Sequence, residues 1–304
     1  MFLKLKVYFL IFKIRIMSIK KFGLKGLLLV GIMVMLIQGF TKLDSKSKEK
    51  FIGLQLYSVR EEMKTDPKGT VAKVGEMGYK FVEAAGYSEG KFYGMTPIEF
   101  KELCETNGMQ FLGSHTGQNV PDKENWTKTM EWWDTAIDAH VAAGVVWIVQ
   151  PWMDEVGYNS LEGLKQYIEY FNVVGEKCKA KGIKFGYHNH DKEFTTEFNG
   201  KPVYDWMLEL TDPEKVMFQL DLYWINYGGK SATDYFDKYS GRFMLWHIKD
   251  KQELGASKTM DFNTVFAEKE KAGLQYGIVE VEEYNFEPLI SVKKSLDYME
   301  TTNY

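Results

Sequence analysis

Residues 183–190 read IKFGYHNH, an apolar run that closes on two histidines, His188 and His190. A long amphipathic stretch, residues 160–181, comes before the run, and Gly182 separates the two. A glycine directly after a helix adopts the left-handed conformation that ends many helices. The stretch therefore predicts a helix, a glycine stop and a buried strand, with histidines at the carboxyl end of the strand.

The same unit recurs along the chain. Apolar runs of strand length alternate with amphipathic stretches, and glycines precede several of the runs, at Gly78, Gly108, Gly144 and Gly273. The expected strands cover residues 51–57, 81–84, 110–115, 145–150, 183–190, 216–221, 243–249 and 276–282. The expected helices cover residues 67–77, 97–107, 125–143, 160–181, 203–210, 233–239, 261–272 and 287–298.

Eight successive strand–helix units indicate one closed parallel sheet, because an open doubly wound sheet usually has fewer strands. No composition break divides residues 51–304. We therefore expect an α/β fold, a single-domain (β/α)8 TIM barrel, over residues 51–304.

The first 49 residues differ in charge from the rest. They hold ten of the 38 basic residues and two of the 42 acidic ones, which leaves 28 basic and 40 acidic residues and a formal charge of −12. Residues 26–37 read GLLLVGIMVMLI and follow Lys20, Lys21 and Lys25, a pattern typical of signal peptides. We expect a signal peptide or an uncleaved N-terminal anchor at residues 1–40 and a linker at residues 41–50.

This pattern predicts an exported chain, periplasmic or anchored in the membrane and facing the periplasm. The acidic charge argues against nucleic acid as a partner, because proteins that bind it present basic patches to the phosphates. Membrane contact is expected only through the N-terminal segment if it is not cleaved, and a homo-oligomer is left open. Cys104 and Cys178 lie in helix patterns and are expected to be buried free thiols.

Polar side chains gather at the expected strand ends, where barrels of this kind carry their chemistry. Four of the five histidines lie there, and His140, in a helix pattern, is expected to be structural. Buried charges are costly unless they pair with a cation or with one another. The strand-end residues are, in chain order, Gln55, Tyr57, Glu83, His115, Gln150, Trp152, His188, His190, Asp221, His247, Lys249, Glu280 and Glu282.

Taken singly, each of these residues has an ordinary structural explanation. Glu83 can pair with Arg60 or a lysine, Asp221 can cap the following loop, and a strand histidine is often a hydrogen-bonded core residue. Together, carboxylates on the sixth and eighth strands and a histidine on the seventh supply mixed oxygen and nitrogen ligands. Such a set suits Mn²⁺, Mg²⁺, Co²⁺ or Zn²⁺, so the pattern predicts a divalent metal ion as cofactor.

Five segments carry a family resemblance: IGLQLYSVR at 52–60, YHNHDKEF at 187–194, QLDLYW at 219–224, HIKD at 247–250 and VEVEEY at 279–284. In order and spacing the chain resembles the xylose-isomerase-like barrel superfamily of sugar phosphate isomerases and epimerases. That superfamily also holds inosose dehydratase and the metal-dependent apurinic endonucleases, of which the endonucleases fit an acidic chain poorly. The resemblance covers about residues 51–304.

The resemblance implies a metal set of Glu, Asp, His and Glu on strands five to eight. Asp221, His247 and Glu280 match the last three, whereas His188 stands where the first glutamate is expected. The epimerases of the superfamily use two metal-bound glutamates as paired bases on opposite faces of the sugar. The chain therefore resembles the dehydratase side more closely, and symmetric epimerisation is in doubt.

The two histidines of strand five are assigned different roles. They are two residues apart, about 6.6 Å along a strand, so one ion with ligand bonds near 2.1 Å is not expected to reach both. His188 aligns with the glutamate of the family and is expected to bind the metal, with His190 beside the substrate. The alternative is that one of them only bonds Asn189, Asp191 or a loop carbonyl.

The resemblance thus implies a metal-dependent sugar isomerase or epimerase that abstracts a proton next to a carbonyl of a small carbohydrate. No glycine-rich phosphate loop marks a strand end, which favours a non-phosphorylated substrate. The alternatives are a sugar dehydratase or lyase acting on keto-sugars or glycosides, and a catalytically silent sugar-binding barrel. The expected roles are metal ligation by His188, Asp221, His247 and Glu280; catalysis by His190, Glu282 and Lys249; and substrate binding by Gln55, Tyr57, Glu83, His115, Gln150 and Trp152.

Overall fold

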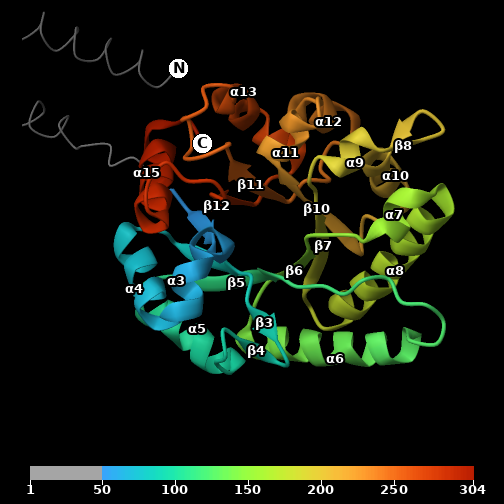
Figure 1. Cartoon of the computed structure of the whole chain (residues 1–304), viewed down its shortest axis with the longest axis horizontal. Helices are drawn as coiled ribbons and strands as arrows, with labels where there is room; N and C mark the ends of the chain where they lie inside the picture. The colour runs from blue at the N-terminus through green and yellow to red at the C-terminus, as the bar shows by residue number, and fades with distance from the viewer. Residues whose placement is uncertain (1–49) are drawn as a thin grey trace, which may run out of the picture. The chain divides into compact units, whose positions relative to one another are not determined.

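Eight parallel strands close into a barrel in the computed structural model, which describes residues 50–304. The strands are β1 (Ile52–Gln55), β2 (Phe81–Ala84), β5 (Gln110–His115), β6 (Trp147–Gln150), β7 (Lys184–His188), β10 (Val216–Asp221), β11 (Leu245–Lys249) and β12 (Tyr276–Glu280). Each strand pairs with its neighbours in chain order, and β1 pairs with both β2 and β12. In Figure 1 the blue first strand accordingly lies beside the red last one. The prediction of a (β/α)8 barrel is confirmed.

Helices alternate with the strands and form the outer ring (Figure 1). Those predicted from the sequence are α4 (Pro67–Met77), α5 (Pro97–Thr106), α6 (Trp126–Ala143), α8 (Leu161–Ala180), α10 (Val203–Leu210), α12 (Ala232–Lys238), α13 (Phe262–Ala267) with α14 (Lys269–Ala272), and α15 (Pro288–Thr301). The glycines predicted to end helices all have left-handed φ angles, from 72° at Gly144 to 108° at Gly78. Because only glycine adopts this conformation at little cost, these positions set where each helix ends.

Shorter elements occupy the loops and were not predicted. They include the 3₁₀ helix η1 (Leu56–Val59) and the helices α3 (Arg60–Thr65), α7 (Glu155–Asn159), α9 (Lys192–Thr195) and α11 (Leu222–Tyr227). Two small hairpins pair β3 (Tyr87–Ser88) with β4 (Lys91–Phe92) and β8 (Glu197–Phe198) with β9 (Lys201–Pro202).

Three strands end two residues earlier than predicted, and a hydrogen bond to a side chain accounts for each. The side chain of Gln55 accepts the N–H of Tyr57 and starts η1. After β7, the N–H of His190 turns to the carboxylate of Glu193. After β12, the N–H of Val281 donates to the Ser58 hydroxyl. Tyr57, His190 and Glu282 therefore lie in loops beyond the strand ends.

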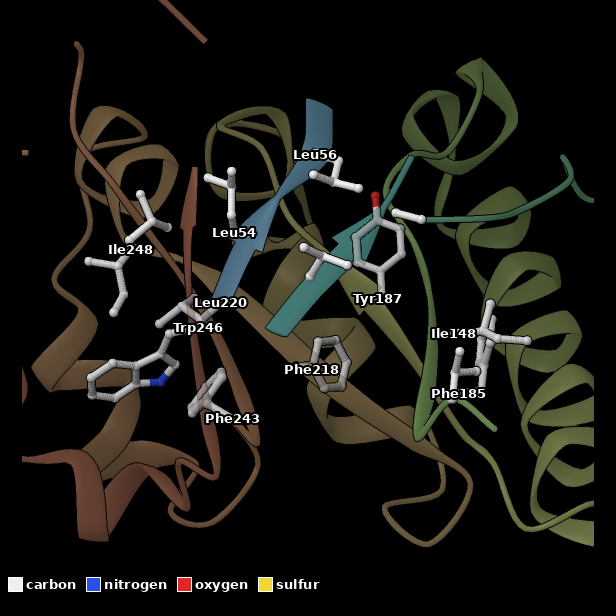
Figure 2. Packing of buried hydrophobic residues seen from close by; sticks show 14 of the residues in the cluster. Leu54, Leu56, Ile148, Phe185, Tyr187, Phe218, Leu220, Phe243, Trp246 and Ile248 are labelled. Atoms are coloured by element: carbon white, nitrogen blue, oxygen red, sulfur yellow. The ribbon is translucent and has the colours of Figure 1, made fainter. Parts of the chain in front are cut away.

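The barrel wall separates two apolar regions. On β11, Trp246 and Ile248 belong to the large cluster between sheet and helices (Figure 2), whereas Leu245 belongs to a smaller cluster inside the barrel. Side chains alternate between the two faces of a strand, so His247 and Lys249 follow Leu245 on the inner face. On β10 the inner face likewise carries Met217, Gln219 and Asp221. The inner face of these strands is thus apolar toward their amino ends and polar at their carboxyl ends, which form the mouth of the barrel.

The remaining predictions about the chain as a whole differ in outcome. Residues 1–40, predicted to be a signal peptide or anchor, and nearly all of the predicted linker 41–50 lie outside the described residues. Within residues 50–304, no helix combines the length and the apolar character that crossing a membrane requires. Cys104 and Cys178 are buried and free, as predicted.

Candidate metal centre and active site

Four side chains from adjacent strands converge at the carboxyl end of the barrel. They are His188 on β7, Asp221 on β10, His247 on β11 and Glu280 on β12, and each offers a ligand atom within 4.8 Å of the others. All four are buried. Ligands about 2.1 Å from one ion can lie up to about 4.2 Å apart, so small side-chain shifts would close the set around a cation.

Asp221 supports this interpretation, because one of its oxygens lacks a partner. Oδ1 accepts the N–H of Trp224 at 2.8 Å and caps α11. Oδ2 is buried, and no hydrogen-bond donor among residues 50–304 reaches it. Burial outweighs the nearby Lys249 and raises the pKa of Asp221 to about 7. A bound cation would supply the missing partner and favour the ionised carboxylate.

His247 lies between two carboxylates. Its Nδ1 is 3.1 Å from Glu280 Oε2 and its Nε2 is 2.8 Å from Glu83 Oε1. Burial lowers the pKa of His247, but Glu280 and Glu83 outweigh it and raise the value to about 10. Burial likewise opposes ionisation of Glu280, yet Lys249 and His247 hold its pKa well below the usual range. In the metal-free protein, the positive charge of protonated His247 therefore offsets the negative charges of Glu83 and Glu280.

His188 is held in the neutral form. Burial lowers its pKa well below the ordinary value, and the nearby His247, His115 and His190 act in the same direction. A neutral imidazole has one nitrogen lone pair and is the form that binds a metal. His188 therefore needs no deprotonation before it can serve as a ligand.

Lys249 places a buried ammonium group beside the cluster. Its Nζ is 3.4 Å from Glu280 Oε2 and forms a second ion pair with Glu282. Burial lowers the pKa of Lys249, but Glu280, Asp221 and Glu282 outweigh it and raise the pKa above the ordinary value. The amine is thus a cation at neutral pH, able to donate a proton or a hydrogen bond but not to accept a proton.

His190 lies outside the set of four, beside an aromatic surface. Its ring centroid is 5.0 Å from that of His188 and 5.5 Å from that of Trp224. Within the described part of the chain, no side-chain hydrogen bond engages its imidazole, whereas its backbone N–H donates to Glu193 at 2.9 Å. The Trp224 ring also faces Lys249 Nζ, 5.6 Å from its centroid. His190, Trp224 and Lys249 therefore border the same space.

The other predicted site residues divide into buried and exposed groups. Gln55, Glu83 and His115 join a hydrogen-bonded network inside the barrel, in which Glu83 Oε1 lies 2.8 Å from Gln55 Nε2 and 3.2 Å from His115 Nε2. Burial raises the pKa of Glu83, but His115 and His247 outweigh it and lower the value below the usual range. Gln150 is buried and bonds backbone groups of Gln118 and Trp152. Tyr57 and Trp152 are exposed, 43% and 41%, at the loops after β1 and β6.

Two buried residues of this network were not predicted from the sequence. Gln219 Nε2 lies 2.9 Å from Glu83 Oε2, and Trp147 Nε1 lies 2.6 Å from the same oxygen. Gly113 makes room for this indole, because a Cβ there would lie 2.0 Å from Trp147 Nε1. The only signal in the sequence was a polar Gln219 at an inward position two residues before Asp221.

Comparisons with known proteins agree with the barrel fold. Residues 71–301 match the family described as "Xylose isomerase-like TIM barrel". A solved structure from Parabacteroides distasonis, a sugar phosphate isomerase/epimerase, is 31% identical with a TM-score of 0.77, and the match covers 86% of this chain and 99% of that one. The 3-keto-D-glucoside 4-epimerase of Escherichia coli has a TM-score of 0.62 at 16% identity, over 83% of this chain and 99% of its own, a likeness of fold alone.

Curated proteins with partial sequence similarity are inosose dehydratases. Inosose dehydratase of Clostridium perfringens is 26% identical over 137 residues, which is 45% of each chain. The matched segment therefore spans less than half the length of that dehydratase. The predicted family resemblance is confirmed by the match over residues 71–301 and by the solved relative. This chain belongs to the family of xylose isomerase-like TIM barrels.

Proposed function

We propose that the chain is a divalent-metal-dependent enzyme that abstracts a proton next to a carbonyl of a small, non-phosphorylated carbohydrate. The observation that carries this proposal is the cluster of His188, Asp221, His247 and Glu280, in which one Asp221 oxygen has no donor among residues 50–304. Two imidazoles and two carboxylates favour Mn²⁺, Co²⁺ or Zn²⁺ over Mg²⁺, which prefers oxygen ligands. A cation in this cluster would polarise the carbonyl and bind neighbouring substrate oxygens.

The predicted catalytic residues outside the metal set have different roles in proton transfer. Lys249 is a buried cation, so it serves as hydrogen-bond donor or acid toward a substrate oxygen. His190 and Glu282 are then the candidate bases, since both lie beyond the strand ends and outside the metal set. The Trp224 ring next to His190 offers an apolar face on which the C–H groups of a sugar ring can stack.

The ligand set also bears on the type of reaction. Two metal-bound glutamates would give equivalent bases on both faces of a sugar, but here His188 replaces one of them. Proton removal on one face followed by isomerisation fits this asymmetry. Elimination, as in a dehydratase or lyase, is the second candidate, and the similarity to inosose dehydratase favours it.

Metal analysis and deuterium exchange test the proposal together. The purified protein is expected to hold about one divalent ion per chain and, with the right sugar of a panel in deuterated water, to place deuterium on a carbon next to the carbonyl. His188→Ala is expected to lose the metal, whereas His190→Ala keeps it and loses turnover.

Two results would count against the proposal. A protein that takes up no divalent ion would remove the metal site. Metal binding without deuterium incorporation, elimination or isomerisation for any sugar of the panel would instead favour a sugar-binding barrel.

A further inference from the structure

A buried network lies directly against the two histidines of the metal set, and the chemistry proposed above does not use it. Its centre is Glu83 on β2 and Gln219 on β10, both fully buried. Glu83 accepts hydrogen bonds from Gln55 Nε2 at 2.8 Å and Trp147 Nε1 at 2.6 Å. Gln55 is itself oriented, because its Oε1 accepts the backbone N–H of Tyr57. The carboxylate of Glu83 is therefore fixed in place by donors from two other strands.

The position of Glu83 determines which way the Gln219 amide faces. Gln219 Nε2 lies 3.2 Å and 2.9 Å from the two Glu83 oxygens. A carboxylate can only accept, so the NH₂ group must be on that side. The carbonyl oxygen of Gln219 then faces His115 Nε2 at 2.7 Å and His188 Nδ1 at 3.0 Å. Since a carbonyl oxygen also only accepts, both of these ring nitrogens carry a proton.

This hydrogen-bond direction selects the tautomer of His188. An imidazole that binds a metal is neutral and has a single lone pair. With the proton on Nδ1, the lone pair of His188 is on Nε2. The strand register supports the contact, because Gln219 pairs with His188 across β10 and β7.

In His247, Glu83 leaves Nδ1 as the nitrogen available to a metal, whereas in His188 the available nitrogen is Nε2. His247 Nε2 donates to Glu83 Oε1 at 2.8 Å, so Nδ1 is the nitrogen on the side of Glu280, 3.1 Å from its Oε2. Partners of this kind beyond the ligands fix ring orientation and tautomer at many metal sites.

We propose that Gln219 and Glu83 are positioning residues that present His188 Nε2 and His247 Nδ1 to the metal. Glu83, predicted from the sequence to bind substrate, would then act through the two histidines. The inference rests on the metal site of the proposed function and adds to it the nitrogen by which each histidine binds.

A pair of matched variants tests Gln219. Gln219→Met keeps the length of the side chain but removes its hydrogen bonds, and it is expected to raise the Mn²⁺ dissociation constant about 10- to 100-fold. Gln150→Met makes the same change at another buried glutamine, whose amide bonds backbone groups rather than a histidine. It is expected to leave Mn²⁺ affinity unchanged. Equal Mn²⁺ affinity of Gln219→Met and the natural protein would overturn the inference.

A second measurement needs neither a variant nor a metal. Long-range ¹H–¹⁵N NMR spectra of the metal-free natural protein, with ¹⁵N-labelled histidine, are expected to show His188 protonated on Nδ1 and not on Nε2. A His188 protonated on Nε2 alone would overturn the inference even if Gln219→Met failed to fold. A natural protein that binds no Mn²⁺ would instead refute the metal site itself, so the two failures are distinguishable.

Discussion

Asp221 shows how one side chain can favour function over stability. Its Oδ2 is buried without a partner among residues 50–304, and burial raises its pKa to about 7. The unfolded chain releases this proton near pH 3.8, whereas the folded chain retains it up to about pH 7. As the pH rises through this window, the metal-free folded state loses stability relative to the unfolded state.

We therefore predict that Asp221→Asn stabilises the metal-free protein. The difference in unfolding free energy from the natural protein should grow from about pH 4 to pH 7, then level off at about 4 kcal/mol. Asparagine keeps the Oδ1 that caps α11, so the helix start is preserved. Adding Mn²⁺ should reverse the order, because only the natural protein gains stability from the ion.

Thermal melts in chelator and in Mn²⁺, over this pH range, check the prediction. A metal-free Asp221→Asn variant that melts below the natural protein at pH 8 would contradict it. So would an equal rise in melting temperature of both proteins on addition of Mn²⁺.

The roles of single residues could be predicted only in part from the sequence. Asp221 and Glu280 end their strands and His247 lies two residues before the end of β11, all at the mouth as expected, because parallel strands place their carboxyl ends at one edge. The bond from Glu83 to Gln219 joins residues 136 apart in the chain. Such a contact depends on barrel closure and on the register between strands, and no local pattern encodes either.

At the scale of elements, the turn between β7 and α9 determines the position of His190. Glu193 on α9 is buried and accepts three hydrogen bonds. Oε1 receives the hydroxyls of Tyr158 at 2.6 Å and Tyr187 at 2.5 Å, and Oε2 receives the N–H of His190 at 2.9 Å. One carboxylate thus ties α7, β7 and α9 together and fixes the turn that carries His190.

We predict that Glu193→Ala lowers kcat about 10- to 100-fold while the protein keeps its metal, because the turn that positions His190 is released. Three buried donors would lose their acceptor, so stability should fall by about 1–3 kcal/mol or more. Glu193→Gln should recover most of the activity, since its carbonyl can accept from His190 while its NH₂ donates to the tyrosine oxygens. Steady-state kinetics with the sugar identified in the panel, and metal content per chain, provide the measurement.

Full activity in Glu193→Ala would show that the turn is held without this carboxylate. Metal loss in the same variant would place Glu193 in the metal site rather than in the loop.

Helix boundaries were more predictable than strand ends for a physical reason. Helices stop at glycines such as Gly144 and Gly273, whose left-handed backbone is a local property of the residue. The end of β12 depends on a contact with a side chain distant in the sequence, because Val281 N–H donates to Ser58. The turn after β7 depends on a hydrogen bond from His190 N–H to Glu193, which periodicity does not encode. The strands predicted from periodicity were therefore too long. They included His190 and Glu282, which lie in the turns that follow β7 and β12.

At the scale of the whole molecule, closure of the barrel makes the site depend on the entire unit. The network and the metal set draw on strands from β1 to β12, and β12 pairs with β1 to close the sheet. The unit starts at Lys50, whose Nζ donates to the carbonyl oxygens of Met299 at 2.5 Å and Thr302 at 2.7 Å. Loss of either end of this unit would thus be expected to affect the site.

We propose that residues 1–49 serve export and are not required for the fold or the site. Their ten basic and two acidic residues contrast with the −12 formal charge of the rest. A protein that begins at Lys50 should therefore be soluble, melt cooperatively and bind the same amount of Mn²⁺ per chain as the full-length chain. Melting curves, size-exclusion chromatography and metal analysis of the two proteins make the comparison, and cell fractionation of the full chain tests export. Aggregation of the shortened protein under conditions where the full chain folds in detergent would show that the barrel needs its N-terminal segment.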